Sequence, residues 1–186
     1  MRKILYYSIV CLLSGLFVSS CGKDEDPVDY TWRNQNEAYF NALESNPDYK
    51  KAEIPGGPGY IYYKTLTDPD ATIGQDTAKF TSVVKVNYSG RYINGLVFDP
   101  GNLPFVYKID GSTFYIDGRG STISSITGWQ IALQNMREGE KWEICIPWTL
   151  AYGASGSSAI PGYTTLVFDI ELEKIVQLHP LPQEET

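Results

Sequence analysis

The sequence predicts an α+β fold in which an antiparallel sheet covers one short helix. The first supporting observation is the composition, because 14 Tyr, 17 Gly and 11 Pro residues favour strands and turns over long helices. The second is the order of segments: strand-like stretches outnumber helix-like ones, and the two do not alternate as they do around a parallel sheet. The chain has 186 residues, 42% of them hydrophobic, and suits one ordinary domain with accessory segments.

The first 20 residues have the pattern of an export signal. Arg2 and Lys3 supply a positive start, and residues 4–18 are largely apolar but too short for a comfortable membrane span. Small residues precede Cys21, as in a bacterial lipobox, in which the cysteine becomes the lipidated first residue of the mature protein. The alternative is an ordinary cleaved signal with an incidental cysteine. From this pattern we expect a lipid anchor on Cys21. Its acyl chains would hold the protein at the membrane, since each buried methylene contributes about 0.8 kcal/mol of membrane binding.

Acidic residues follow the cysteine and predict a solvated tether over residues 21–30. The run that starts at Lys23 also resembles the lysine-then-acidic tag that sends some lipoproteins of two-membrane bacteria to the cell surface. We therefore expect an outer-membrane lipoprotein that faces the periplasm or the cell surface.

Apolar residues at helical spacing predict a short amphipathic helix over residues 31–43, with Thr31 as its N-cap. Pro47 ends it, because the residue before a proline disfavours the helical conformation. An isolated helix of this length is marginal and must pack on something. We expect it to dock on its own domain, and a dimer contact is the alternative. The apolar stripe comprises Trp32, Tyr39, Phe40 and Leu43.

The Gly- and Pro-rich stretch 54–59 predicts a hinge or a turn-rich boundary, after which the strand patterns begin. The predicted organisation is a leader (1–20), a tether (21–30), a helical extension (31–55), a main domain (56–178) and a flexible tail (179–186).

Within the main domain, β-branched and aromatic residues predict strands at 60–65, 82–88, 113–116, 141–146 and 164–175. Asn94-Gly95 is a hairpin signal. The main-domain helix is predicted over residues 127–136, where Trp129 and Met136 belong to one apolar stripe. Three segments are predicted to be irregular or loops: 100–112, 117–125 and 152–163.

Charge and cysteine usage exclude several function classes. The net charge is −7, or −9 once Arg2 and Lys3 leave with the leader, so the basic footprint of a nucleic-acid-binding protein is missing from the sequence. Cys145 is the one cysteine in the predicted main domain, which leaves no internal disulfide there. A lone His179 and no cysteine pair argue against a zinc site, and we expect neither a metal nor a cofactor.

Several short motifs occur in a fixed order, and the set is more specific than any one of them. They are Val84-Lys85-Val86-Asn87-Tyr88-Ser89-Gly90, Asn94-Gly95, Phe98-Asp99, Ile126-Thr127-Gly128-Trp129, Met136 with Gly139, Ile146-Pro147, Ala151-Tyr152-Gly153, and the strand from Leu166 to Leu172. Over roughly residues 58–176 this order resembles FKBP-type peptidyl-prolyl cis–trans isomerases. The resemblance implies an FKBP-like antiparallel sheet wrapped around one short helix, here with an N-terminal helical extension.

The resemblance also implies an aromatic catalytic pocket with Trp129 as its floor and Asp99 at its edge. Ile126 would offer its N–H, and Tyr152 its hydroxyl, to substrate carbonyls. Ser125 replaces a larger aliphatic residue among the substrate-binding positions, and Ile160 would lie in an overhanging loop. The implied walls are Tyr88, Phe98, Ile126, Tyr152 and Phe168. Implied partners are proline-containing polypeptides and the macrolide inhibitors of the family.

The sequence departs from the family pattern after Asp99. Pro100-Gly101 follows instead of serines, no arginine occurs before Arg119, and Lys108 is the one cation in that loop. The segment 100–125 is longer than usual. An aromatic residue normally contributed by this region is not identified, because three residues compete for the position: Phe105, Tyr107 and Phe114.

An aromatic pocket suits prolyl isomerisation because the barrier is amide resonance, about 18–20 kcal/mol. The planar amide is more dipolar and better hydrated than the twisted one, so a pocket that strips water favours the twisted form. No nucleophile or metal is required. The predicted function is therefore isomerisation of Xaa-Pro bonds in exported proteins. The alternative is a non-catalytic FKBP-like module that binds partners, or a chaperone that acts through the Trp32 helix.

Overall fold

The computed structural model describes residues 30–68, 70–74, 76–101, 105–112, 114–116, 119–121 and 125–176. The predicted leader, the lipidation site Cys21, almost all of the tether and the tail lie outside the described residues, so these remain predictions. Among the described residues, no helix has both the length and the apolar character of a membrane span.

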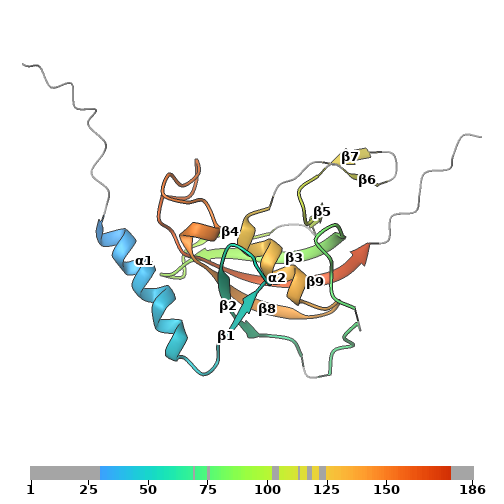
Figure 1. The fold of residues 1–186 in the computed structure, drawn as a ribbon, viewed down its shortest axis with the longest axis horizontal. Helices are drawn as coiled ribbons and strands as arrows, with labels where there is room; N and C mark the ends of the chain where they lie inside the picture. The colour runs from blue at the N-terminus through green and yellow to red at the C-terminus, as the bar shows by residue number, and fades with distance from the viewer. Residues whose placement is uncertain are drawn as a thin grey trace, which may run out of the picture.

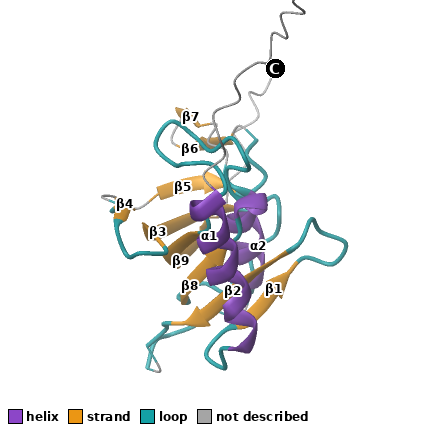
Figure 2. Cartoon of the chain, turned by 90° about the vertical axis from the view of Figure 1, so that its left-hand side faces the viewer, coloured by secondary structure: helices purple, strands orange, loops and turns teal. Residues whose placement is uncertain are grey.

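The fold is a seven-stranded antiparallel sheet with one helix on each face (Figures 1 and 2). Neighbouring strands follow the order β1-β2-β8-β9-β3-β4, and β5 also pairs with β3. The strands are β1 (Lys50–Glu53), β2 (Tyr60–Thr65), β3 (Val83–Tyr92), β4 (Val97–Asp99), β5 (Phe105–Lys108), β8 (Lys141–Ile146) and β9 (Leu166–Val176). A separate hairpin comprises β6 (Phe114–Ile116) and β7 (Arg119–Ser121).

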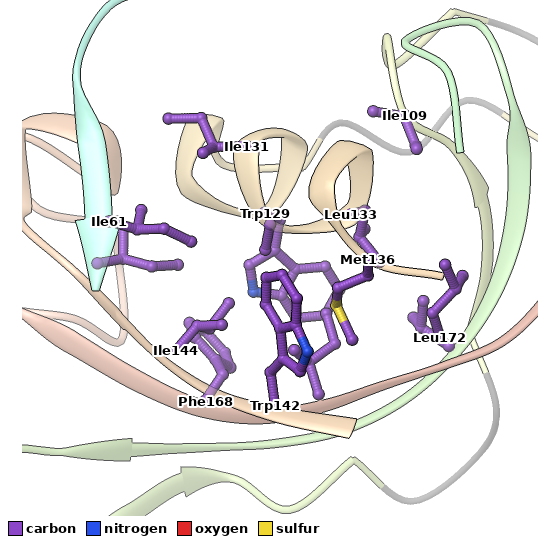
Figure 3. Packing of buried hydrophobic residues seen from close by; sticks show 14 of the residues in the cluster. Ile61, Ile109, Trp129, Ile131, Leu133, Met136, Trp142, Ile144, Phe168 and Leu172 are labelled. Atoms are coloured by element: carbon purple, nitrogen blue, oxygen red, sulfur yellow. The ribbon is translucent and has the colours of Figure 1, made fainter. Parts of the chain in front are cut away.

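Helix α2 (Thr127–Asn135) covers the inner face of the sheet, where it forms the main core. Figure 3 shows Trp129 and Leu133 of α2, and Met136 just after the helix, pointing towards Trp142, Phe168 and Leu172 of the strands. Facing residues in the register, such as Ile144 and Phe168, share this face because side chains alternate along a strand. The predicted α+β architecture is confirmed.

Helix α1 (Tyr30–Ala42), continued by the short 3₁₀ turn Leu43–Ser45, covers the outer face. Phe40 and Leu43 pack against Tyr62, Cys145 and Val167, which are register partners on neighbouring strands. The predicted docking of this helix on its own domain is therefore confirmed. Because helices cover both faces, five consecutive residues of β8 are buried.

The structure corrects several predicted boundaries. Helix α1 already includes Tyr30, so Thr31 lies inside it and is not the N-cap. The turn-rich stretch 54–59 is a turn between the paired strands β1 and β2, which puts residues of the predicted extension and of the predicted main domain in one sheet. Strand β1 escaped prediction because Ala52 is its one buried side chain, which leaves no hydrophobic alternation to detect.

Two more strands lie in segments that the sequence predicted as irregular. Strand β5 lies within 100–112, and β7 lies within the predicted loop 117–125. Both are short strands that pair with a neighbour, β5 with β3 and β7 with β6. A single 3₁₀ turn, Trp148–Leu150, also precedes the predicted loop. The strands predicted at 60–65 and 141–146 have the observed bounds.

Candidate active site

The described residues line an apolar pocket with a cavity volume of about 120 Å³ that opens to solvent. The lining side chains come from strands β3, β4 and β9, from helix α2 and the two residues before it, and from the loop after β8. They are Tyr88, Phe98, Asp99, Ser125, Ile126, Trp129, Tyr152 and Phe168.

The pocket floor is built from rings in edge-to-face contact. The Trp129 ring centroid lies 4.8 Å from that of Tyr88 and 5.3 Å from that of Phe168, with interplanar angles of 77° and 83°. Phe98 meets Phe168 at 5.6 Å and 89°. Such T-shaped pairs add about 0.5–1.5 kcal/mol beyond their buried area. The four rings therefore hold one another in place and form a rigid apolar surface.

Trp129 reaches the floor because α2 packs closely on the sheet. A Cβ at Gly128 would lie 2.3 Å from Ile146 Cγ2, so only glycine permits this approach. The indole is 6% exposed, although it lies at the base of an open pocket.

A β-bulge places two consecutive residues of β4 at the pocket. Gly90 pairs with Asp99 and Arg91 pairs with Val97, which leaves Phe98 as the extra residue. A bulge breaks the regular alternation of side chains, so Phe98 and Asp99 both line the pocket. Gly90 makes room for the rings, because a Cβ there would lie 2.6 Å from Phe98 Cζ and 2.7 Å from Phe168 Cε1.

Two hydrogen bonds hold Asp99 at the pocket edge. The Tyr88 hydroxyl donates to Asp99 Oδ2 at 2.8 Å, and the Gly101 N–H donates to Asp99 Oδ1 at 3.0 Å. Lys108 is not a partner, because its ammonium group pairs with Asp110 at 3.3 Å and with the Ser112 hydroxyl at 2.7 Å. The Tyr88 hydroxyl and a backbone amide thus bond the carboxylate for which the sequence supplies no nearby arginine.

Both tyrosines of the pocket are protonated at neutral pH. Burial, and then the hydrogen bond to Asp99, raise the pKa of Tyr88 to about 12. Burial, and then the nearby Asp99 charge, raise the pKa of Tyr152. Tyr152 is 42% exposed at the pocket mouth, where its hydroxyl can donate to a bound chain.

Ser125 and Ile126 line the pocket just before α2. Among the described residues, the buried Ser125 hydroxyl has no hydrogen-bond partner. Ile160 lies in the loop between β8 and β9, is 5% exposed, belongs to the same core cluster as Trp129 and Phe168, and is not among the residues that line the pocket. The side chains of Phe105, Tyr107 and Phe114, which competed for one pocket position, lie outside the described set.

Tyr92 contacts the pocket residue Phe98 and was not predicted from the sequence. Its ring lies 5.1 Å from Phe98, and its hydroxyl donates to the Ala159 carbonyl at 3.0 Å. The available signal was its position four residues after Tyr88 on one strand, since every second residue of a strand shares a face.

The part of the chain that the structure describes holds no group of three or more His, Cys, Asp or Glu side chains arranged to bind a metal ion. The pocket itself offers apolar rings, a carboxylate held by two hydrogen bonds, and phenol donors.

The chain is similar to known proteins of one enzyme family. Residues 74–173 match the family model described as FKBP-type peptidyl-prolyl cis-trans isomerase. The chain is 41% identical over 135 residues to the FKBP-type 22 kDa peptidyl-prolyl cis-trans isomerase of Escherichia coli, a match that covers 72% of this chain and 58% of that relative. It is also 41% identical over 188 residues to the macrophage infectivity potentiator of Trypanosoma cruzi, which covers 94% of this chain and 87% of that protein.

Solved structures show the same fold. The peptidyl-prolyl cis-trans isomerase of Pseudomonas syringae pv. tomato aligns with a TM-score of 0.62 at 28% identity, over 80% of this chain and 96% of its own. FkpA of Escherichia coli aligns with a TM-score of 0.61 at 27% identity, over 78% of this chain and 60% of its own.

Proposed function

The chain belongs to the FKBP-type peptidyl-prolyl cis–trans isomerase family, and on that premise we propose that it accelerates rotation of Xaa-Pro bonds in exported polypeptides. The observation that carries this proposal is the pocket of mutually packed rings around Trp129, open on one side and bordered by Tyr152 and Asp99. Family membership rests on the matched residues 74–173 and on the relatives at 41% identity.

The pocket lowers the barrier by binding the twisted amide better than the planar one. A planar Xaa-Pro amide loses hydration when it enters a site walled by Phe98, Trp129 and Phe168, whereas the less dipolar twisted amide loses less. The proline ring packs on Trp129. In this mechanism the protein forms no covalent bond and moves no proton.

The polar groups at the rim orient the chain on either side of the proline. The Tyr152 hydroxyl and the backbone N–H of Ile126 are the proposed donors to substrate carbonyls. Asp99, fixed by Tyr88 and the Gly101 amide, presents a carboxylate of defined position beside the rotating bond. Such fixed groups act without reorganising during the reaction.

The direct test measures isomerisation of a short Xaa-Pro peptide by the purified protein beside Phe98→Ala and Asp99→Ala. Phe80→Ala is the matched control, because Phe80 is 48% exposed and does not line the pocket. We expect acceleration that falls in the first two variants and persists in the control. If the parent protein gives no acceleration while circular dichroism shows it folded, the non-catalytic binding module becomes the better explanation.

The family's macrolide inhibitors are a second probe of the same pocket. We propose that they occupy it in competition with a proline-containing peptide, since its aromatic lining carries a few fixed polar groups, as small-molecule sites do. Competition in the isomerisation assay supports the assignment, and macrolide binding that leaves the assay unchanged contradicts it.

We further propose that Cys21 carries a lipid anchor that holds the domain at the outer membrane, facing the periplasm or the cell surface. The support is the leader pattern of residues 1–20 with small residues before Cys21. Fractionation and fatty-acid labelling of cells that produce the natural chain or Cys21→Ser test it. Membrane-bound, labelled parent protein and an unlabelled, released variant are expected; equal labelling of both excludes this anchor.

A further inference from the structure

Helix α1 packs against the segment that joins β8 to β9 (residues 147–165, the β8–β9 loop). This loop carries Tyr152 to the pocket mouth. In Figure 1, α1 and the loop lie at the same end of the molecule, on the left of the view, and hydrogen bonds given below join them directly.

Trp32 of α1 bonds to the end of this loop. Its Nε1–H donates to Thr164 Oγ1 at 3.0 Å, and the Thr164 hydroxyl donates to the Pro161 carbonyl at 2.6 Å. One turn later, buried Asn36 accepts the Thr165 N–H at 2.8 Å through its side-chain oxygen. The carbonyl of Asn36 also accepts the Thr165 hydroxyl at 3.1 Å.

Arg33 and Glu37 bond to both ends of the loop. The Arg33 guanidinium lies 4.7 Å from the Tyr163 ring centroid and 2.9 Å from Glu37 Oε1. Trp148, at the start of the loop, donates from Nε1 to the same Glu37 oxygen at 3.1 Å. The Trp148 and Tyr163 rings pack edge-to-face with centroids 4.9 Å apart.

Trp32 also reaches the pocket wall through Tyr92. The Trp32 and Tyr92 rings meet at 6.0 Å and 75°, and Tyr92 packs on Phe98 at 5.1 Å. The Tyr92 hydroxyl donates to Ala159, in the middle of the loop. A continuous set of contacts therefore joins α1 to the pocket wall and to the loop that carries Tyr152.

We propose that α1 is a positioning element of the isomerase pocket and that Trp32 is its principal positioning residue. Trp32 holds the β8–β9 loop so that Tyr152 meets the substrate at a fixed place; the proposal rests on the isomerase function above. The loop has no strand or helix after Leu150, so its own backbone hydrogen bonds, Tyr163 N–H to the Gly153 carbonyl and Gly156 N–H to the Tyr152 carbonyl, connect the end that α1 holds to Tyr152.

The test compares Trp32→Ala with Trp32→Phe in the full-length protein. Trp32→Phe keeps a ring against Tyr92 but loses the N–H that Thr164 accepts. We expect KM for an Xaa-Pro peptide to rise about tenfold in Trp32→Ala, because misplacing a substrate-binding group by about 1 Å weakens its interaction with the substrate. The rise should be smaller in Trp32→Phe. Amide exchange of Gly156 and Tyr163, whose N–H groups bond within the loop, should accelerate in the same order.

Phe40→Leu is the matched control, since Phe40 packs on Tyr60 and Tyr62 at the other end of α1. Partial unfolding lowers the amount of active enzyme and so the apparent kcat, with KM unchanged. A raised KM and faster loop exchange in Trp32→Ala, neither of which occurs in Phe40→Leu at matched loss of Tm, support the proposal.

Unchanged KM and loop exchange in Trp32→Ala overturn it. A parent protein without isomerase activity defeats the proposed function instead, and the amide exchange then reports separately on whether Trp32 holds the loop.

Discussion

The Tyr88 hydroxyl donates a 2.8 Å hydrogen bond to Asp99 Oδ2 across the hairpin that joins β3 to β4. The same tyrosine ring packs edge-on against Trp129, at the pocket floor. One residue thus fixes the carboxylate at the rim and the indole at the base. Changes that separate these two contributions are the most informative tests of the site.

Tyr88→Phe removes the hydrogen bond and keeps the ring. We expect the free energy of unfolding to fall by about 1 kcal/mol, a usual net value for one hydrogen bond. We expect kcat/KM for an Xaa-Pro peptide to fall by about three- to tenfold, since each 1.4 kcal/mol of lost transition-state stabilisation is tenfold. Tyr30→Phe, in which the parent side chain is 65% exposed, is the control and should leave both unchanged. Full activity in Tyr88→Phe would show that Asp99 needs no fixed orientation.

Gly90→Ala inserts a methyl group between two rings of the pocket. Its Cβ would lie 2.6 Å from Phe98 and 2.7 Å from Phe168, so the rings must move. We expect a loss of about 1–3 kcal/mol in stability, the usual cost of overpacking, together with loss of peptide isomerisation. Chemical denaturation and the peptide assay check the two effects. Ser89→Ala, at the preceding position, is the control; equal damage from both changes would refute the steric explanation.

The raised pKa of Tyr88 predicts how the free energy of unfolding changes at alkaline pH. The pKa of Tyr88 in the folded protein is raised to about 12, above its value in the unfolded chain. Its protonated form therefore contributes stability that is complete below about pH 10 and is lost as the pH rises towards 12. We expect the free energy of unfolding to fall over this range, and to fall less steeply in Tyr88→Phe. Denaturation series at pH 8, 10 and 11 measure this, and parallel curves would contradict it.

Asn36→Ala tests the docking of α1. Asn36 is fully buried, and its side chain satisfies the N–H of Thr165. Leaving that buried donor unpaired should cost about 1–3 kcal/mol. Asn41→Ala, on the exposed side of the same helix, is the matched control and should change stability by no more than about 0.5 kcal/mol. Thermal unfolding of both variants is sufficient, and equal Tm values would show that this contact does not stabilise the helix.

Local patterns were sufficient for the elements that carry most of the core. Strands β2 and β8 have their predicted bounds, and α2 ends one residue before the predicted Met136, because a strong apolar pattern reports burial directly. Strand β1 has one buried side chain and so shows no apolar pattern. It forms by pairing with β2. Short strands whose partners lie elsewhere cannot be recognised from their own residues.

The ordered motifs also identified most of the residues that meet at the pocket. Trp129, Phe98 and Phe168 were assigned to one site from the resemblance, and the structure brings them into ring contact. Ile160 was assigned to a loop over the site; it lies in the β8–β9 loop, and its side chain is buried in the same core cluster as Trp129 and Phe168. Position in a motif indicates where a residue lies along the chain, whereas the direction of its side chain depends on how the loop folds.

The amino-acid sequence by itself determined the fold class, the family and the aromatic character of the pocket, because periodicity and the order of motifs can be read along the chain without knowing which segments pack together. Only the tertiary structure decided which donors hold Asp99 and what supports the β8–β9 loop. Trp32 and Thr164, which join α1 to that loop, are 132 residues apart in the chain. The choice between many possible hydrogen-bond partners is made when distant segments pack together, and no local pattern records it.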